Sequence, residues 1–262
     1  MPAATIASAP RHLLGRTALT LGVLGGALAL LHVFGRYEFD YALVWGQGTY
    51  IERFAKGLLL TLGISVGGMV IAIVLGAVGA AGRLSRRWVP NQLAAIYVEV
   101  VRGTPFLVQI LVVYYGLRPV LRGAGWPEAI VGDVPLAVLT LGVFGGAYVT
   151  EIIRGALESV PHGQVEAARA QGLGPAATMR FVVVPQALPA MVPALTGQLV
   201  NLVKDSSLFS AVAVMELMKQ GRTAVANTYA AFEVYVPLAF LYLLVTFPLG
   251  RLARRLETKA AV

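Results

Sequence analysis

The sequence lacks cysteine altogether and has few histidines and few charged residues. Without cysteine, disulfide frameworks, thiolate metal sites and cysteine nucleophiles are excluded. The three histidines, His12, His32 and His162, are scattered and show no HExxH-like spacing, so a metal site is not expected. Charged residues make up only 13% of the chain, whereas soluble domains have about a quarter. The composition therefore places the chain in a lipid bilayer.

Acidic residues are scarcer than basic ones, which leaves a formal net charge of +8. The lysines and arginines stand at the ends of apolar runs and do not alternate with aromatic residues on a polar face. This distribution is typical of membrane topology signals, so nucleic-acid binding is not expected. The GxxxxGK[ST] pattern is also missing, so we expect no ATP binding or hydrolysis by this chain and no cofactor in it. A partner must supply the energy for any work that it does.

Six apolar runs account for most of the sequence. Hydrophobic residues make up 57% of the chain, and its mean hydropathy is +0.74. A span needs about 20 apolar residues and must be helical, because lipid offers backbone groups no hydrogen-bond partners. The runs are Leu13 to Phe34, Phe54 to Ala81, Val89 to Leu117, Val134 to Ile153, Phe181 to Val203 and Phe232 to Gly250. We predict an all-α membrane protein without a separate soluble domain.

These runs give a simple domain organisation. We predict a tail and a first span in residues 1–35, a transmembrane domain in 54–250 and a basic tail in 251–262. The first run could instead be a secretory signal, because Ala27-Leu28-Ala29 resembles a cleavage site. The run continues past that site to Phe34, which favours an uncleaved anchor.

Basic residues at the ends of the runs predict the orientation. With six spans drawn, one side collects Arg11, Arg16, Arg83, Arg86, Arg87, Arg154, Arg169, Arg180, Arg251, Arg254, Arg255 and Lys259. Lysine and arginine are enriched in cytoplasmic loops. We therefore expect this side, and both termini, to be cytoplasmic.

The longest loop on that side has the sequence of a helix, a turn and a second helix. Pro161 suits a first helical turn, and the residues up to Gln171 are good helix formers. Gly172 then ends this helix, and Pro175 starts the next. Its alanines would let a partner groove approach, and Glu166 offers a charge to a basic group. A helix lying on lipid headgroups is the alternative, although large apolar residues are few.

The same loop resembles the EAA loop of ABC importer permeases. Glu166-Ala167-Ala168 is followed after three residues by Gly172, and after nine more by Val182, one residue and Val184-Pro185. The spacing matches the family pattern, with valines in place of its Ile and Leu. The resemblance implies that Glu166, Ala167, Ala168 and Gly172 dock to a separate ATP-binding subunit, which binds the ATP.

Three further segments resemble those of polar amino-acid permeases. They are Arg102-Gly103-Thr104-Pro105, the stretch from Ala147 to Gly155 (AYVTEIIRG), and Lys204-Asp205-Ser206-Ser207-Leu208. The resemblance implies a type I ABC importer fold with five core helices plus one N-terminal transmembrane helix. It also implies a polar amino acid as substrate and a bacterial inner-membrane location. The expected partners are a second permease chain, identical or different, and a periplasmic or surface solute-binding protein.

Polar residues in the third run, Val89 to Leu117, could line a path. Glu99, Arg102 and Gln109 are predicted to share one helix face, and ionisable residues in a span generally face the protein interior or water. Thr104 and Pro105 should kink or interrupt this helix. A Glu99 to Arg102 ion pair that only fixes helix packing is the alternative, and both remain open.

The fifth run combines prolines with a polar stripe. Prolines recur every four residues from Pro185 to Pro193, so the helix should bend. Gln198, Asn201 and Asp205 follow at helical spacing beside Lys204, and could hold the carboxylate and ammonium of an amino acid. Alternatively, Lys204 and Asp205 cap the end of the span.

A secondary transporter, a membrane-embedded enzyme and a scaffold protein are each expected to have sequence features that differ from those of this chain. A secondary transporter often shows repeated halves, and no repeat is visible. A membrane-embedded enzyme would need a catalytic constellation, yet Ser65, Ser206 and Ser207 have no histidine nearby in sequence. A scaffold protein would not need the polar stripes. An ABC permease for another small polar solute remains an alternative to the amino-acid permease.

Overall fold

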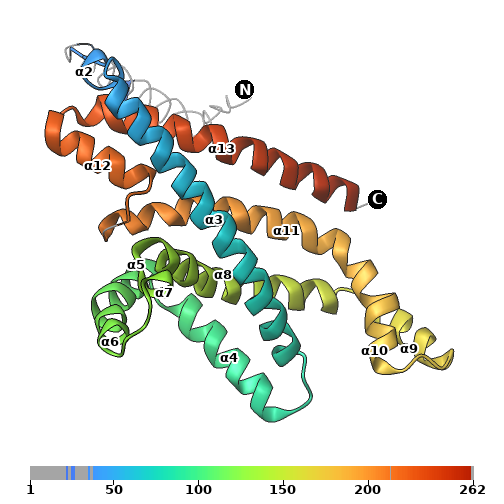
Figure 1. The fold of residues 1–262 in the computed structure, drawn as a ribbon. Coiled ribbons are helices and arrows are strands. Elements are labelled where there is room, and N and C mark those ends of the chain that lie inside the picture. Colours follow the sequence, from blue (N-terminus) through green and yellow to red (C-terminus); the bar gives the residue numbers. More distant parts are fainter. Residues whose placement is uncertain (1–21, 23–24, 27–34, 36–37, 213, 261–262) are drawn as a thin grey trace, which may run out of the picture. The chain divides into compact units, whose positions relative to one another are not determined.

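The computed structural model describes residues 22, 25–26, 35, 38–212 and 214–260. The chain divides into two units, Met1–Tyr41 and Ala42–Val262, and the second contains the long helices of Figure 1. The predicted first span, Leu13 to Phe34, falls almost wholly outside the described residues.

The second unit is helical, and its described part contains no strand. The α-helices are α2 (Ala42–Trp45), α3 (Gly48–Arg83), α4 (Trp88–Gly103), α5 (Phe106–Leu111), α6 (Arg118–Gly123), α7 (Glu128–Val131), α8 (Asp133–Glu158), α9 (His162–Ala170), α10 (Pro175–Thr178), α11 (Val184–Asp205), α12 (Leu217–Thr228) and α13 (Ala231–Ala260). Two π-helical segments, η1 (Val112–Leu117) and η2 (Met179–Val183), and the 3-10 helix η3 (Ser206–Ala211) extend them.

Within the described residues, five helical segments are long and apolar enough to cross a membrane. They are Gly48–Arg83, Phe106–Gly123, Asp133–Glu158, Pro175–Ala211 and Ala231–Thr258. This confirms the predicted all-α membrane protein and places a span in each of the five runs after Phe34. Figure 1 also shows the helix curving between α10 and α11, where the prolines begin.

The second of these runs is broken into two helices. Thr104 is extended, with φ −119° and ψ 145°, because a residue before proline is disfavoured in the helical region. The predicted interruption at Thr104 and Pro105 is therefore confirmed. The chain resumes as α5, η1 and α6, and only this second part is long enough to span.

Glycines allow α3 and α8 to cross at very short range (Figure 1). A Cβ on Gly79 would lie 2.3 Å from Oγ1 of Thr150, and one on Gly142 would lie 2.6 Å from Cβ of Ile71. Small residues serve this purpose in membranes, where helix association depends on close van der Waals packing. The close steric fit at these glycines therefore stabilises the crossing of α3 and α8.

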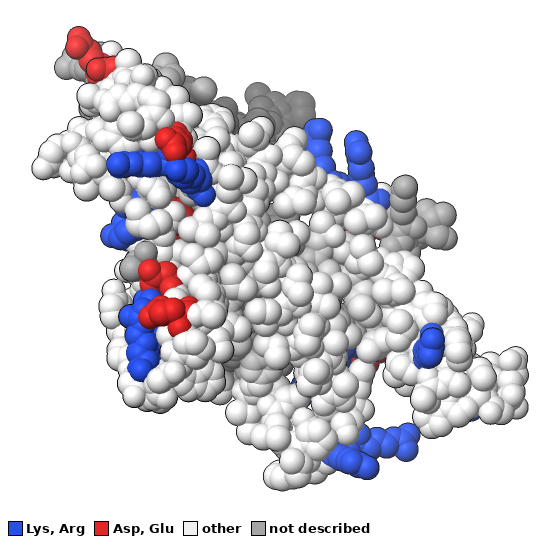
Figure 2. Space-filling view, in the orientation of Figure 1, with Lys and Arg blue, Asp and Glu red and all other residues white. Residues whose placement is uncertain are grey.

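Charged side chains are rare in the middle of the face drawn in Figure 2. Figure 2 shows a broad uncharged band, with lysine, arginine and acidic side chains gathered toward its edges. In Figure 1 the α3–α4 turn, α9, α10 and the end of α13 lie toward one end of the bundle, and α2, α6 and α12 toward the other. This is the distribution expected of a protein that crosses a bilayer.

Candidate functional site

A polar hollow lies between α4, α8 and α11, where three of the predicted pathway residues meet. Arg102 comes from α4, and Gln198 and Asn201 come from α11. The volume of the hollow is about 580 Å³, within the range of about 300 to 1,000 Å³ typical of small-molecule sites. Two further polar side chains, Tyr148 and Glu151, enter from α8. Sequence reasoning did not select these two, although both lie in the AYVTEIIRG segment.

Arg102 is the charged side chain of the hollow without a direct ion-pair partner. The ion pairs of residues 38–212 and 214–260 do not include it. Its guanidinium lies over the ring of Tyr148, with 5.1 Å between Cζ and the ring centroid. The expected alternative, an ion pair with Glu99, is therefore absent from this part of the chain.

Glu151 is compensated by two arginines. Arg154 donates hydrogen bonds of 3.0 Å from Nε and 2.6 Å from Nη2 to one carboxylate oxygen. Nε of Arg83 lies 3.6 Å from the other oxygen, which is close enough for attraction but too long for a hydrogen bond. The carboxylate thus joins the end of α3 to the C-terminal part of α8, and Arg102, whose charge also acts on it, is the one charge of the hollow without an ion pair.

The depth of the hollow follows from helix geometry. Arg102 lies about 21 Å along α4 from Trp88, and Tyr148 about 15 Å before the end of α8 at Glu158. A bilayer core is about 30 Å thick. The polar side chains therefore lie away from these two helix ends, and ionisable residues within such apolar segments mark functional sites.

Gln109 does not share a helix face with Arg102, so that prediction is wrong. The break at Thr104 resets the helical periodicity, and Gln109 belongs to α5. Its Nε2 turns back to donate to the carbonyl of Val101 at 2.8 Å and to the hydroxyl and carbonyl of Thr104 at 2.9 and 3.2 Å. Gln109 therefore satisfies backbone acceptors that the break exposes.

Three other predicted residues lie outside the hollow. Glu99 is exposed on α4, one turn before Arg102, and does not line it. Lys204 faces a separate hollow of about 340 Å³ with Ser207, Tyr235 and Tyr242. Asp205 is the last residue of α11 and lines neither. Of the polar stripe expected along α11, only Gln198 and Asn201 line this hollow.

The loop after α8 has the predicted shape. Helix α9 follows Pro161, and Gly172 adopts a φ of +85° that favours glycine. The N–H of Gly172 donates to the carbonyl of Arg169 at 2.9 Å, and that of Leu173 to the carbonyl of Ala168 at 3.2 Å. Pro175 then opens α10.

The surface of α9 is divided between the chain and its surroundings. Glu166 and Ala167 are exposed, as is Gly172 after the helix, whereas Ala168 is only 5% exposed and faces the chain itself. Val165 packs against an apolar cluster that includes Val160 after α8, Val183 and residues of α11. Helix α9 thus packs against α8 and α11. Other residues of these two helices line the polar hollow.

Glu216 is a buried carboxylate that sequence reasoning missed. It is fully buried before α12, and accepts hydrogen bonds from the N–H groups of Met218 at 2.8 Å and Lys219 at 2.6 Å. The hydroxyl of Thr61 in α3 lies 3.5 Å from it and accepts from the N–H of Leu217 at 3.2 Å. The sequence signal for it was an acidic residue between the apolar runs Phe181 to Val203 and Phe232 to Gly250.

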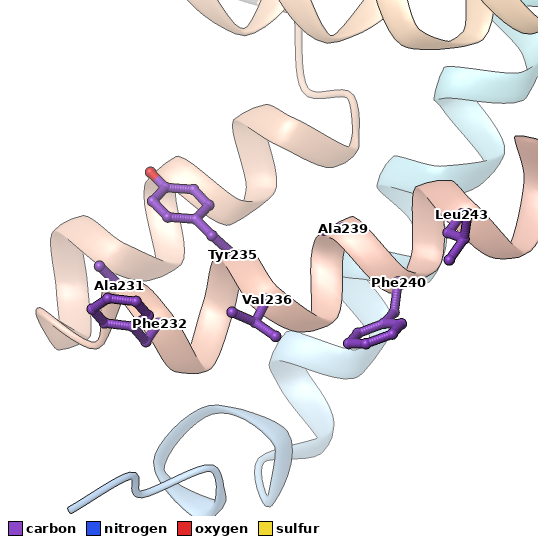
Figure 3. A pocket seen from close by; sticks show the side chains of 7 residues that line it. All are labelled: Ala231, Phe232, Tyr235, Val236, Ala239, Phe240 and Leu243. Carbon is purple, nitrogen blue, oxygen red and sulfur yellow. The ribbon is translucent and has the colours of Figure 1, made fainter. Parts of the chain in front are cut away.

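An apolar hollow on α13 does not compete as a polar site. Figure 3 shows its side chains along one helix, including Phe232, Val236, Phe240 and Leu243. The hydroxyl of Tyr235 is the one polar side-chain group among its lining residues. Such a face on a membrane span suits lipid contact.

Among the described residues, no group of acidic side chains or histidines could hold a metal ion.

Comparison with known proteins assigns the family. The family model described as binding-protein-dependent transport system inner membrane component matches residues 68–262. The chain belongs to this family. It is therefore a membrane component of a transport system and not an enzyme.

Related proteins agree with this assignment. The glutamine transport system permease protein GlnP of Escherichia coli (strain K12) is 34% identical over 225 residues, covering 86% of this chain and 99% of the relative. The octopine transport system permease protein OccM of Rhizobium radiobacter is 34% identical over 230 residues, covering 84% and 89%.

Solved structures agree on the fold. A crystal structure of an amino acid ABC transporter with histidines has a TM-score of 0.74 at 31% identity, covering 85% of this chain and all of the other. The MetNI methionine ABC transporter in an inward-facing form matches at a TM-score of 0.64 and 24% identity, which speaks for the fold alone. The fold is that of type I ABC importer permeases, as the sequence predicted.

Proposed function

We propose that this permease carries a polar amino acid across the inner membrane, driven by ATP hydrolysis in a separate subunit. The observation that carries the proposal is the polar hollow at Arg102, Tyr148, Gln198 and Asn201 in a chain of this family. Relatives named for glutamine and octopine transport support an amino acid as the substrate. Glu99, Gln109, Lys204 and Asp205 do not line this hollow.

Helix α9 is the proposed docking element for the ATP-binding subunit. Glu166, Ala167 and Gly172 are open to a partner, and Ala168 anchors the helix from the inside. Because Val165 packs against the cluster formed with α8 and α11, a displacement of α9 would reach the helices that form the hollow. Packed side chains transmit such displacements well, since protein interiors are dense.

The remaining parts of the importer follow from the family. A second permease chain would complete the pathway, and a solute-binding protein would deliver the amino acid on the outer side. The basic end of the bundle, with α9, α10 and the end of α13, would face the cytoplasm. Both termini would then lie in the cytoplasm if residues 1–35 add a sixth span.

The test is energised uptake by the complete importer in vesicles. Uptake of a polar amino acid should require ATP hydrolysis and should persist when the proton gradient is collapsed. Glu166→Lys and Ala167→Arg should each reduce co-purification of the ATP-binding subunit. Ala176→Arg, on an exposed position of α10 in the same loop, is the matched control and should not.

Two results would overturn parts of the proposal. Full assembly and normal uptake in both α9 variants would show that α9 is not the docking element. Uptake that survives a block of ATP hydrolysis but stops without the proton gradient would indicate ion coupling instead.

A further inference from the structure

The polar hollow also carries information about the charge of its occupant. We propose that it binds an amino acid with an uncharged side chain, whose carboxylate pairs with Arg102, and that it disfavours amino acids with cationic side chains. This inference rests on the proposed transport function and names the substrate class of the same hollow.

The first step is the state of Arg102. The guanidinium is exposed within the single chain and makes no ion pair with a described residue. The guanidinium lies over the face of the Tyr148 ring, and its charge acts on Glu151 only weakly, after those of Arg154 and Arg83. Arginine presents a planar set of donors that matches a carboxylate, so the α-carboxylate of an amino acid is a suitable partner.

The second step is the state of Glu151, the one acidic side chain that lines the hollow. A cationic substrate side chain would need a carboxylate, but this one already accepts two hydrogen bonds from Arg154 and lies near Arg83. Its second oxygen is buried, with almost no accessible surface. Taking Glu151 from these partners would leave Arg83 without an acidic partner and Arg154 with Glu158 alone, which is unfavourable for partly buried charges.

The third step is the remaining polar surface. Gln198, which is 6% exposed, and Asn201 offer amide groups, which both donate and accept hydrogen bonds. Amides suit an uncharged polar side chain and the ammonium group of the substrate backbone. An acidic side chain would bring a second carboxylate, and the lining residues offer no second unengaged cation for it.

One carboxylate lies near the hollow without lining it. Glu99 is one helical turn before Arg102 on α4 and is exposed. If its carboxylate moved to pair with Arg102, the hollow would lose its unengaged charge. Glu99→Gln therefore belongs to the test and should leave the charge preference unchanged.

Amino-acid binding should be measured on the purified permease and ATP-binding complex in nanodiscs, without the binding protein. Radiolabelled glutamine is the probe, and glutamate, lysine and arginine are the competitors. We expect glutamine to bind and the other three to compete at least about tenfold less well, as loss of one charged hydrogen-bond partner implies.

Four variants sharpen the test. Arg102→Gln should weaken glutamine binding by about tenfold, and Arg102→Lys should restore part of it. Arg87→Gln, an exposed arginine just before the same helix, is the matched control and should have no effect. Asn201→Asp adds a carboxylate to the wall and should raise lysine binding relative to glutamine.

The outcomes separate this inference from the proposed function. Equal competition by lysine, an unchanged Arg102→Gln variant, or absence of glutamine binding to the complex overturns the inference, even when ATP-driven uptake is normal. Absence of ATP-driven amino-acid uptake by the complete importer overturns the proposed function itself.

Discussion

The hydroxyl of Tyr242 donates a hydrogen bond of 3.1 Å to the buried carboxylate of Glu216. Tyr242 belongs to α13, whereas Glu216 caps the start of α12 and also meets Thr61 of α3. One carboxylate therefore connects α12 and α13 with α3, which is distant from both in sequence. Buried polar networks of this kind are stabilising only while each member is satisfied.

Replacing Glu216 should loosen this junction. In Glu216→Ala the N–H groups of Met218 and Lys219 lose their acceptor, and the hydroxyl of Tyr242 loses its partner. We expect a loss of about 2 kcal/mol or more, since a helix cap alone contributes about 1 kcal/mol. Thermal unfolding of the detergent-solubilised protein measures it. Glu257→Ala, an exposed glutamate on α13, is the control and should unfold like the parent protein.

The same carboxyl predicts a pH dependence of stability. Burial raises the pKa of Glu216 to about 7, against the opposing effect of the hydrogen bonds that it accepts. The folded protein therefore holds this proton more tightly than the unfolded chain, in which the pKa is near 4.5. The contribution of Glu216 to stability is complete below about pH 4.5 and is lost as the pH rises through about 7.

This titration can be isolated with Glu216→Gln, which removes the ionisable group. The difference in unfolding temperature between the parent protein and this variant should change between about pH 4.5 and 7. A difference that stays constant across this range would mean that Glu216 does not titrate there.

The α3–α8 crossing should not tolerate a methyl group. Gly79→Ala places a Cβ 2.3 Å from the Thr150 hydroxyl, and overpacking of this kind costs about 1 to 3 kcal/mol. We expect a lower unfolding temperature and a smaller folded yield. Gly63→Ala on the same helix has nothing within 4 Å of its new Cβ and should be neutral. Thr150→Ala should partly rescue Gly79→Ala, and lack of any rescue would contradict the steric explanation.

The break between α4 and α5 should depend on the Gln109 amide. Gln109→Met keeps the length of the side chain but leaves the carbonyls of Val101 and Thr104 without this donor. Unsatisfied acceptors away from water cost about 1 to 3 kcal/mol each, so the unfolding temperature should fall. Gln92→Met, on an exposed position of α4, provides the comparison. If both variants unfold alike, the amide does not support the break.

Gly172 should be needed for its backbone conformation alone. A Cβ there meets nothing within 4 Å, yet the φ of +85° is unfavourable for other residues. Gly172→Val should cost about 1 kcal/mol or more and impair ATP-driven uptake, whereas Gly172→Asn should be milder. Gly174→Ala, two residues later at a φ of −66°, should leave uptake intact. Equal uptake by Gly172→Val and Gly174→Ala would remove the argument from φ.

Much of this architecture could be predicted from the sequence because lipid permits few backbone solutions. The apolar runs give the spans, and Gly172 and Pro175 give the helix ends around the loop. Thr104 and Pro105 predict where the helix of the third run is interrupted, but not that the break would redirect Gln109 to the backbone of α4. A periodicity argument fails wherever the helix that it assumes is interrupted.

The site itself was only partly predictable. Arg102 and Asn201 were identified as polar residues in apolar runs, but their common hollow depends on how α4, α8 and α11 pack. Glu151 was recognisable only as part of a segment. Glu216 lacks a usual N-cap signature, because Ser, Thr, Asp and Asn are the preferred caps.

The glycine-mediated fit of α3 against α8 also determines which parts of the permease can move. With Gly79 and Gly142 seated against the opposing helix, these two helices can neither slide nor separate without losing contacts along the crossing. Helix α4 is seated on the same pair, because a Cβ on Gly146 would lie 2.6 Å from the Tyr97 hydroxyl and one on Gly82 would lie 3.0 Å from the Pro90 carbonyl oxygen. The pair α3 and α8 should therefore form a fixed frame that also holds the helix carrying Arg102.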